Sequence, residues 1–303
     1  MRLKTVLQVT RAPFFASLVS SVLVGAAIAW KEGSFHPGYL LLTVLGIICV
    51  NAGMNMGNDY FDHLSGNDAI NSELTPFSGG SRTIQEGILT ARQVLAGSLL
   101  FYIIASVIGL YLSVMRGWPV LWVGLIGMFL ALFSNAPPFR LNYVGHGLAE
   151  LATGLGAGPL IVLGSYYVQA QRLTQEALCA GLAMGFLGAA LIYINEFPDH
   201  DADKAVGKTT LVVVLGRERA VQGYIALLGG VYAVVTVGTA MGVFPYTMWV
   251  VLLTLPLARK SIQVAMRFHS DTPRLIPAMA GTIQLYLANA ILICLAYSAA
   301  RFL

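Results

Sequence analysis

The chain has 303 residues, of which 57% are hydrophobic and only 11% are charged. A soluble domain usually carries about 25% charged residues, so this composition excludes an ordinary soluble enzyme and indicates an integral membrane protein. The formal net charge of +4 comes without a basic stripe interleaved with exposed aromatic residues. We therefore expect membrane lipid around the protein and no nucleic-acid partner.

Nine apolar segments are candidates for membrane helices, each of which needs about 20 apolar residues to span the bilayer. The alternating pattern of barrel strands is missing from the sequence, so the predicted fold is all-α. We expect one membrane-embedded domain over residues 1–303, with a first half at about 14–135 and a second half at about 148–258. The expected helices cover about residues 14–30, 38–57, 94–114, 118–135, 148–168, 176–195, 220–241, 245–258 and 276–300.

The first predicted helix follows the basic start MRLK, which resembles a secretory signal. Arg11 and Pro13 interrupt the apolar run, so we expect this helix to be retained. With the N-terminus inside, 14 of the 18 Lys and Arg residues, Arg2 among them, lie on the cytoplasmic side. The four on the other side are Lys31, Arg116, Arg172 and Arg301. This bias predicts a multi-pass protein of the cell inner (cytoplasmic) membrane with a cytoplasmic N-terminus.

The second predicted helix ends in the polar segment NDYFDHLSGND, residues 58–68. Asn58 and Asp62 are four residues apart, so they share one face if the helix continues. Asp68 follows at a longer step, and Arg82 in GGSR supplies a cation beyond it. The orientation of the helices places this segment on the cytoplasmic side.

The sixth predicted helix ends in a similar segment, NEFPDHDADKAVGK. Asn195, Asp199 and Asp203 are spaced by four residues, and Lys204 and Lys208 follow. Nine of the 14 acidic residues fall in these two segments and in the loop that follows the first, which adds Glu73 and Glu86. Carboxylates at a bilayer boundary are costly unless they are paired or metal-bound. The two helices lie four apart in the chain and run the same way, which predicts a parallel internal repeat with facing half-sites.

The two acidic segments offer oxygen ligands without clusters of His or Cys. Such ligands suit Mg²⁺, whose coordination is often completed by substrate phosphates, so we predict a diphosphate substrate. A cation or proton transporter is the alternative from another functional class, because transporters also combine internal repeats with membrane acids. The acids of transporters usually lie near the middle of the bilayer, whereas these acids lie at one end of the predicted helices.

These segments resemble the two aspartate-rich signatures of the UbiA superfamily of intramembrane prenyltransferases. The resemblance rests on NDYFDHLSGND with GGSRTIQEGILT, and on NEFPDHDADKAVGKTTLVVVLG. The stretches SNAPPFRLNYVGHGLAEL and GPLIVLGSYYVQ are similar to the 1,4-dihydroxy-2-naphthoate polyprenyltransferases of menaquinone biosynthesis. The resemblance runs from about Arg11 to beyond Gly216 and implies a UbiA-type fold with nine transmembrane helices.

The resemblance also implies a site in which two Mg²⁺ ions are bridged by the diphosphate of a polyprenyl donor. The implied metal ligands are Asn58, Asp62, Asp68, Asn195, Asp199 and Asp203. Gly66 stands where a strict four-residue step would place the third acid of the first motif, and Asp68 takes its role. The diphosphate also needs fixed cations, and the candidates are Arg82, Arg140, Lys204 and Lys208.

The implied reaction is transfer of the polyprenyl group to an aromatic acceptor, with 1,4-dihydroxy-2-naphthoate and loss of its carboxyl group as the expected case. Asp62 and Asp199 are the expected catalytic metal ligands, and Asp59 is the expected proton acceptor because it is an acid beyond those needed for metal. The alternatives within the superfamily are 4-hydroxybenzoate, homogentisate or a chlorophyll precursor as acceptor, or cyclisation of the prenyl group to a terpene without an acceptor.

Overall fold

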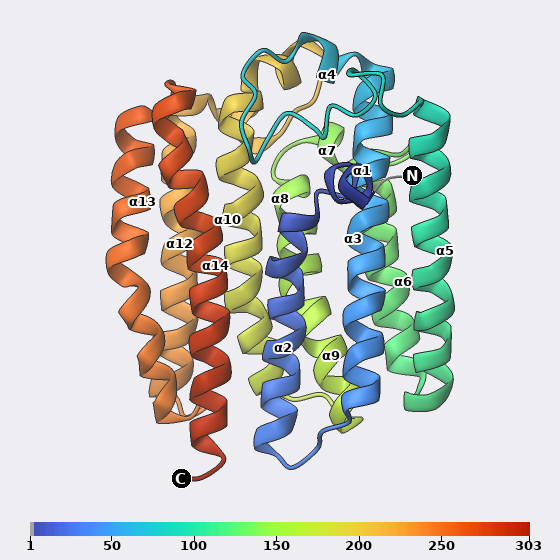
Figure 1. Ribbon diagram of the computed structural model, residues 1–303. Coiled ribbons are helices and arrows are strands. Elements are labelled where there is room, and N and C mark those ends of the chain that lie inside the picture. Colours follow the sequence, from blue (N-terminus) through green and yellow to red (C-terminus); the bar gives the residue numbers. More distant parts are fainter. Residues whose placement is uncertain (1–2) are drawn as a thin grey trace.

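The computed structural model describes residues 3–303, and every regular element in this range is a helix (Figure 1). Eight stretches within it are long and apolar enough to span a membrane. They are η1 and α2 (Ala12–Lys31), α3 (Pro37–Ser65), α5 (Ala91–Arg116), α8 to α9 (Leu148–Ala170), α10 (Gln175–Ala205), α12 (Arg217–Ala240), η3 and α13 (Tyr246–Phe268) and α14 (Thr272–Ala300). A further apolar helix, α6 (Trp118–Phe133), has 16 residues.

Each of the nine predicted segments therefore falls on an apolar helix, which confirms the all-α, multi-pass architecture. Nine membrane crossings remain a prediction, because α6 is shorter than the usual span of about 20 residues. Arg2, one of the cations expected on the cytoplasmic side, lies outside the described residues.

The two helices that carry the motifs are longer than predicted. We expected them to end near residues 57 and 195, but α3 continues to Ser65 and α10 to Ala205. The polar motif residues are helical because their side chains face the interior of the protein rather than solvent. α3 ends where Gly66 adopts a left-handed conformation with φ of 80°, which suits glycine as a helix terminator.

The long helices stand side by side, with α12, α13 and α14 at one edge and α5 and α6 at the other (Figure 1). The main hydrophobic core lies among α2, α10, α12 and α14 and includes the fully buried side chains of Tyr193, Tyr224 and Tyr286. At the opposite edge, α5 and α6 expose large apolar side chains such as Leu110, Trp118 and Trp122. Apolar exposure on outer helices is what a lipid environment favours.

Close helix packing at α10 depends on residues without side chains. The end of α8 and the π-helical turn η2 (Gly156–Leu160) pack against α10 at Gly185. An added Cβ there would lie only 2.8 Å from the carbonyl oxygen of Gly154 and 3.0 Å from Cδ of Pro159. Small residues of this kind allow membrane helices to approach closely. α10 is thereby held in the middle of the bundle, with its motif end facing that of α3.

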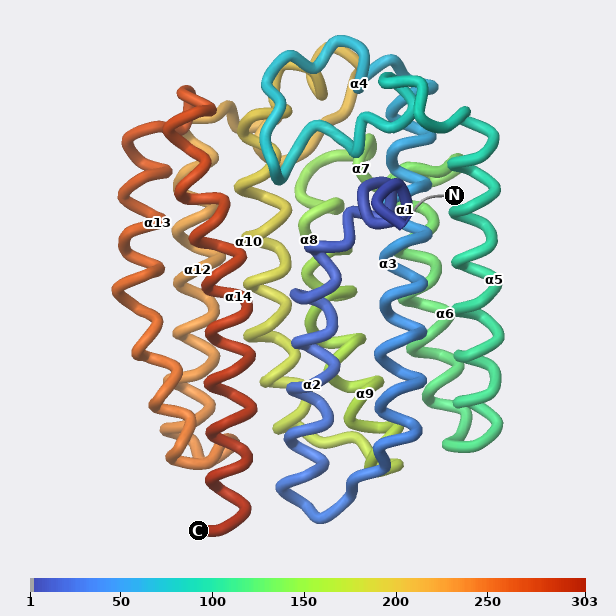
Figure 2. Tube along the Cα trace, in the orientation of Figure 1, coloured from blue at the N-terminus to red at the C-terminus, as the bar shows by residue number. Residues whose placement is uncertain are grey.

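Short helices gather at the end of the bundle where α3 and α10 carry their motifs. These are α1 (Leu3–Val9), α4 (Asn67–Ile70), α7 (Leu141–Val144) and α11 (Leu211–Leu215). The segment 71–90 between α4 and α5 crosses the same end, as the blue-green tube in Figure 2 shows. The two motifs therefore lie beneath a cover of short helices and connecting chain.

Candidate active site

The two predicted motifs line a single cavity of about 660 Å³. On each motif helix the polar side chains recur every four residues, which places them on one face. The first motif is completed from α4, which follows directly after the turn at Gly66. All six predicted metal ligands are part of the lining: Asn58, Asp62, Asp68, Asn195, Asp199 and Asp203.

Lys208 joins the two motifs electrostatically. Its Nζ atom lies 2.7 Å from Asp62 Oδ1 and 3.4 Å from Asp203 Oδ1, and its side chain is buried within the cavity lining. Burial by itself lowers the pKa of the Lys208 ammonium, but the two carboxylates outweigh this effect and raise the pKa. Lys208 is therefore charged, and it neutralises acids from both halves of the site.

Asparagine side chains make further links between the motifs. Asn67 Nδ2 donates to Asp203 Oδ1 at 2.6 Å, and Asn71 Nδ2 donates to Asp199 Oδ1 at 2.8 Å. Asn67 is the first residue of α4, and Asn71 directly follows its last residue. The two asparagines therefore link the first motif to the acids of α10. The amides hold the carboxylates in place without adding charge to the cavity.

Asp68 is the most strongly perturbed acid outside the membrane helices. Burial, together with the nearby carboxylates of Asp62 and Asp59, raises the pKa of Asp68 to about 7. Gln85 Nε2 donates to Asp68 Oδ2 at 3.0 Å, and Arg82 donates to the backbone oxygen of Asp68. The site thus concentrates more negative charge than Lys208 alone balances, as a cation-binding site requires.

The oxygen donors fit Mg²⁺. Within residues 3–303 no three His, Cys, Asp or Glu side chains are gathered closely enough to hold a metal unaided. Lys208 and the asparagine amides engage the carboxylates instead. Two further amide oxygens, Asn67 Oδ1 and Asn195 Oδ1, are buried without a hydrogen-bond donor. Carboxylate and amide oxygens around a space open to a phosphate ligand are the donor set that Mg²⁺ prefers.

Only one of the four predicted diphosphate-binding cations, Lys208, lines the cavity. Arg82 contacts the backbone of Asp68 from outside the lining, and Lys204 is exposed. Arg140 is also exposed, with its guanidinium 5.4 Å from the centre of the Tyr143 ring. Sequence proximity to the motifs was the basis for these predictions, but it does not fix the direction of a long side chain.

Arg11 is the cation that sequence reasoning missed. It lines the cavity, and its Nη2 atom lies 2.6 Å from Asp59 Oδ1. Asp59 is buried, also accepts from the backbone N–H of Ser81 at 3.2 Å, and does not line the cavity. The predicted role of Asp59 as proton acceptor stays a prediction. The sequence did contain a signal for Arg11, because a charged residue within an apolar membrane segment indicates a functional site.

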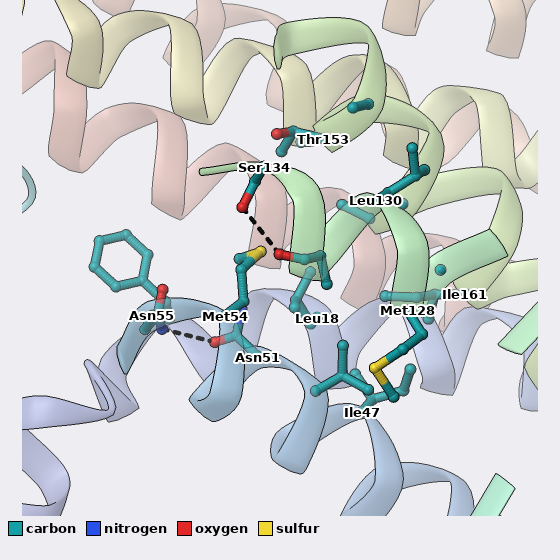
Figure 3. Close-up of a pocket in the computed structure, with 18 of the residues that line it drawn as sticks. Leu18, Ile47, Asn51, Met54, Asn55, Met128, Leu130, Ser134, Thr153 and Ile161 are labelled. Carbon is teal, nitrogen blue, oxygen red and sulfur yellow. Dashed lines mark hydrogen bonds between the residues drawn. The ribbon is translucent and has the colours of Figure 1, made fainter. Parts of the chain in front are cut away.

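The rest of the cavity is apolar and runs along the bundle axis. On α3 its lining recurs every three or four residues from Leu42 to Asp62, a length of about 30 Å at 1.5 Å per residue. The stripe changes from apolar Leu42 and Ile47 to polar Asn51 and Asn55 on approaching the motif. Figure 3 shows part of this transition. The cavity can hold a molecule with an anionic head and a long apolar tail.

The sequence profile of the UbiA prenyltransferase family matches residues 18–283. The chain belongs to this family. It is therefore a membrane prenyltransferase, and the resemblance inferred from the motifs is confirmed.

Two curated relatives of this prenyltransferase are named for naphthoquinone or naphthoate substrates. It is 25% identical to a 2-carboxy-1,4-naphthoquinone phytyltransferase of Synechocystis sp., over 95% of this chain and 91% of the relative. It is 26% identical to a 1,4-dihydroxy-2-naphthoate octaprenyltransferase of Escherichia coli, over 88% of this chain and 85% of the relative.

Solved UbiA structures share the fold. A UbiA homolog from Aeropyrum pernix K1 in its apo form aligns with a TM-score of 0.67 at 16% identity, covering 92% of this chain and 97% of that one. A UbiA homolog from Archaeoglobus fulgidus bound to GPP and Mg²⁺ aligns with a TM-score of 0.64 at 14% identity, covering 95% and 98%.

The ion pair between Arg11 and Asp59 generates a stability prediction. Arg11→Gln should lower the free energy of unfolding by about 3 kcal/mol, because it leaves the buried carboxylate of Asp59 unpaired. Adding Asp59→Asn should recover most of the loss, because it removes the uncompensated charge. Thermal unfolding in detergent measures both effects, with the exposed Arg140→Gln as control. A double variant as unstable as Arg11→Gln alone would contradict the pairing.

Proposed function

We propose that the protein transfers a polyprenyl group from a polyprenyl diphosphate to 1,4-dihydroxy-2-naphthoate in menaquinone biosynthesis. The observation that carries the proposal is the single cavity with acidic motifs and Lys208 at one end and an apolar channel at the other. The choice of acceptor is supported by the naphthoate and naphthoquinone prenyltransferases among the relatives. In the reaction the carbon–oxygen bond to diphosphate breaks, a carbon–carbon bond to the ring forms, and the ring carboxyl leaves as carbon dioxide.

The diphosphate binds at the motif end of the cavity in this proposal. Asn58, Asp62 and Asp68 from one motif and Asn195, Asp199 and Asp203 from the other would hold Mg²⁺, and we propose two ions. Mg²⁺ bound with GPP in the Archaeoglobus fulgidus homolog supports this assignment. When bound, Mg²⁺ supplies positive charge to the leaving diphosphate.

Lys208 and Arg11 are the chain's own cations for the diphosphate. Both line the cavity, and both are paired with carboxylates in this structure. Lys208 lies between carboxylates of both motifs, where the diphosphate would bind, whereas Arg11 is paired with Asp59, which does not line the cavity. We therefore assign Lys208 to phosphate binding and Arg11 to fixed electrostatic support. Arg82, Arg140 and Lys204 reach the diphosphate in this proposal only if their side chains reorient.

Water must be excluded once diphosphate departs, because the allylic cation would otherwise react with it. The segment 71–90 and the short helices cover the motif end, and the backbone of this segment passes close to the site (Figure 2). At Gly80, with φ of 76°, an added Cβ would lie 2.9 Å from Asp68 Oδ1. This close approach requires glycine at position 80. It places the backbone of the segment 71–90 directly against Asp68, which helps to exclude water.

Turnover with separate acceptors tests the proposal. Purified protein with Mg²⁺ and geranylgeranyl diphosphate should convert 1,4-dihydroxy-2-naphthoate to a prenylated, decarboxylated naphthoquinol, detected by mass spectrometry. Reactions with 4-hydroxybenzoate, with homogentisate and without acceptor are the comparison. Prenylation of another acceptor, or a cyclised hydrocarbon, would overturn the naphthoate assignment. Absence of diphosphate release in every reaction would contradict the proposed donor chemistry.

The metal-ligand assignment predicts a selective loss among neighbouring acids. Asp62→Ala or Asp199→Ala should lower turnover by roughly a hundredfold or more, since a bound metal contributes several kcal/mol to stabilising the transition state. Both should also abolish Mg²⁺-dependent retention of labelled donor. Asp201→Ala is the matched control, because Asp201 also lies on α10 but its side chain is 71% exposed and paired with Arg217. Equal losses in Asp199→Ala and Asp201→Ala would argue against the assignment.

We also propose that the motif end faces the cytoplasm, in the inner membrane. The support is the bias of Lys and Arg toward that side of the chain. Leu64 lies at the motif end of α3 and is 62% exposed, so Leu64→Cys in a background without Cys49, Cys179 and Cys294 reports the orientation. The cysteine should react with a membrane-impermeant maleimide only after the cytoplasmic face is opened. Labelling in intact cells whose outer membrane alone has been permeabilised would reverse the topology.

A further inference from the structure

We propose that Glu196 accepts a hydrogen bond from a hydroxyl group of the aromatic acceptor and thereby positions the ring beside the bond that breaks. This inference rests on the proposed function, because it takes the cavity to hold a prenyl diphosphate and an acceptor together. Glu196 lines the cavity, although it is not one of the six expected metal ligands. It would be a further specificity-determining contact for the reaction.

Glu196 is a buried acid without a partner. Only 6% of the residue is exposed, and within residues 3–303 neither carboxyl oxygen accepts a hydrogen bond. Lys208 pairs with Asp62 and Asp203 instead. A buried carboxyl group without a hydrogen-bond donor or a cation is costly. We infer that the donor arrives with a ligand.

The groups around Glu196 do not supply that donor. Glu150, Asp199 and Asp203 are all close enough to act on Glu196 electrostatically, and all three are acids. The hydroxyl group of Tyr193, three residues earlier on α10, packs against α12 and makes no hydrogen bond. The carboxyl group is therefore left to face the cavity that it lines.

Glu196 lies where the cavity lining changes from apolar to polar. On α10 this lining passes from Gly188 and Ile192 to Glu196 and then to Asp199, at steps of three or four residues that share one side of the helix. Asp199, a proposed metal ligand, lies about 4.5 Å further toward the motif end. The bond that breaks joins the diphosphate to the first carbon of the prenyl chain. The acceptor ring must therefore approach at this boundary.

Among the ligands of the proposed reaction, the acceptor suits this carboxyl group best. The prenyl chain has no polar hydrogen, and the diphosphate is an anion that a further acid would repel. Carboxyl oxygens accept hydrogen bonds, and a hydroxyl group on an aromatic ring can donate one. Glu196 thus favours an acceptor that turns a hydroxyl group toward it and its own carboxylate away.

The test replaces Glu196 with leucine and with glutamine. Leucine removes both oxygens at a similar side-chain volume, whereas glutamine keeps one oxygen that can accept from the ligand. Glu150→Gln is the matched control, because Glu150 is a buried acid beside Glu196 that does not line the cavity. The backbone N–H of Leu211 donates to Glu150 Oε1 at 2.7 Å, and the amide oxygen of glutamine can accept the same bond.

Equilibrium binding of acceptors is measured with Mg²⁺ and a non-hydrolysable thio analogue of geranylgeranyl diphosphate, so that no turnover occurs. The acceptors are 1,4-dihydroxy-2-naphthoate and the analogues that lack one hydroxyl group, 1-hydroxy-2-naphthoate and 4-hydroxy-2-naphthoate. The native protein should bind the dihydroxy compound roughly tenfold or more tightly than one of the analogues. Glu196→Leu should reduce that ratio to about one, Glu196→Gln should keep part of it, and Glu150→Gln should keep all of it.

Two further readouts separate acceptor binding from other roles of Glu196. Mg²⁺-dependent retention of labelled donor should be unchanged in Glu196→Leu. Its thermal unfolding should occur at or above the native temperature, because the substitution removes no hydrogen bond of the ligand-free protein. Lost donor retention would instead make Glu196 a metal ligand, and a lowered unfolding temperature would make it a structural support. Either result overturns the inference, as does a native protein without the hydroxyl preference.

Failure of the proposed function gives a different result. If the native protein transfers the prenyl chain to another hydroxylated acceptor, the naphthoate assignment fails, and the same comparison between that acceptor and its deoxy analogue decides the role of Glu196. If the native protein retains no prenyl diphosphate, both proposals fail. If it prenylates the naphthoate but Glu196→Leu keeps the hydroxyl preference, the role of Glu196 alone fails.

Discussion

The ion pairs of Lys208 hold the two halves of the site together. Asp62 and Asp203 come from different helices, and both are buried at one end of a membrane bundle. Two carboxylates in such a place repel one another unless a cation lies between them. Lys208 supplies that charge in this structure, so the motifs remain folded toward each other while the cavity between them stays open to a ligand.

A charged site for a diphosphate must be continuous with an apolar cavity that can hold the prenyl chain of the donor. α3 makes the connection, because one stripe of its surface lines the whole cavity and changes from apolar to polar along its length. The edge helices α5 and α6 contribute only to the apolar part, and α10 contributes only to the part nearer the motifs. The charged end and the apolar part of the cavity are thereby lined largely by different helices.

Much of the site could be predicted from sequence because its central signal is local. A spacing of four residues places Asn58 with Asp62, and Asn195 with Asp199 and Asp203, on one helix face each, and the cavity receives all of them. Helix ends were harder to predict, because the polar motif residues look like loop in a sequence but continue α3 and α10 when they face a shared interior site.

The contacts that depend on tertiary structure could not be predicted. Asn67 and Asn71 reach acids 136 and 128 residues away, and nothing in their own neighbourhood indicates those partners. The same limit explains why Arg11 was missed and why Arg82, Arg140 and Lys204 were chosen. Their distance from the motifs along the chain was visible, but the direction of their side chains depends on helices elsewhere in the sequence.

The most direct measurement is an experimental structure of the protein with Mg²⁺ and a non-hydrolysable thio analogue of geranylgeranyl diphosphate. We predict the diphosphate between Asp62 and Asp199, with Lys208 turned toward a phosphate oxygen and the prenyl chain in the apolar part of the same cavity. A diphosphate bound away from the two motifs, or a prenyl chain outside this cavity, would contradict the proposed donor site.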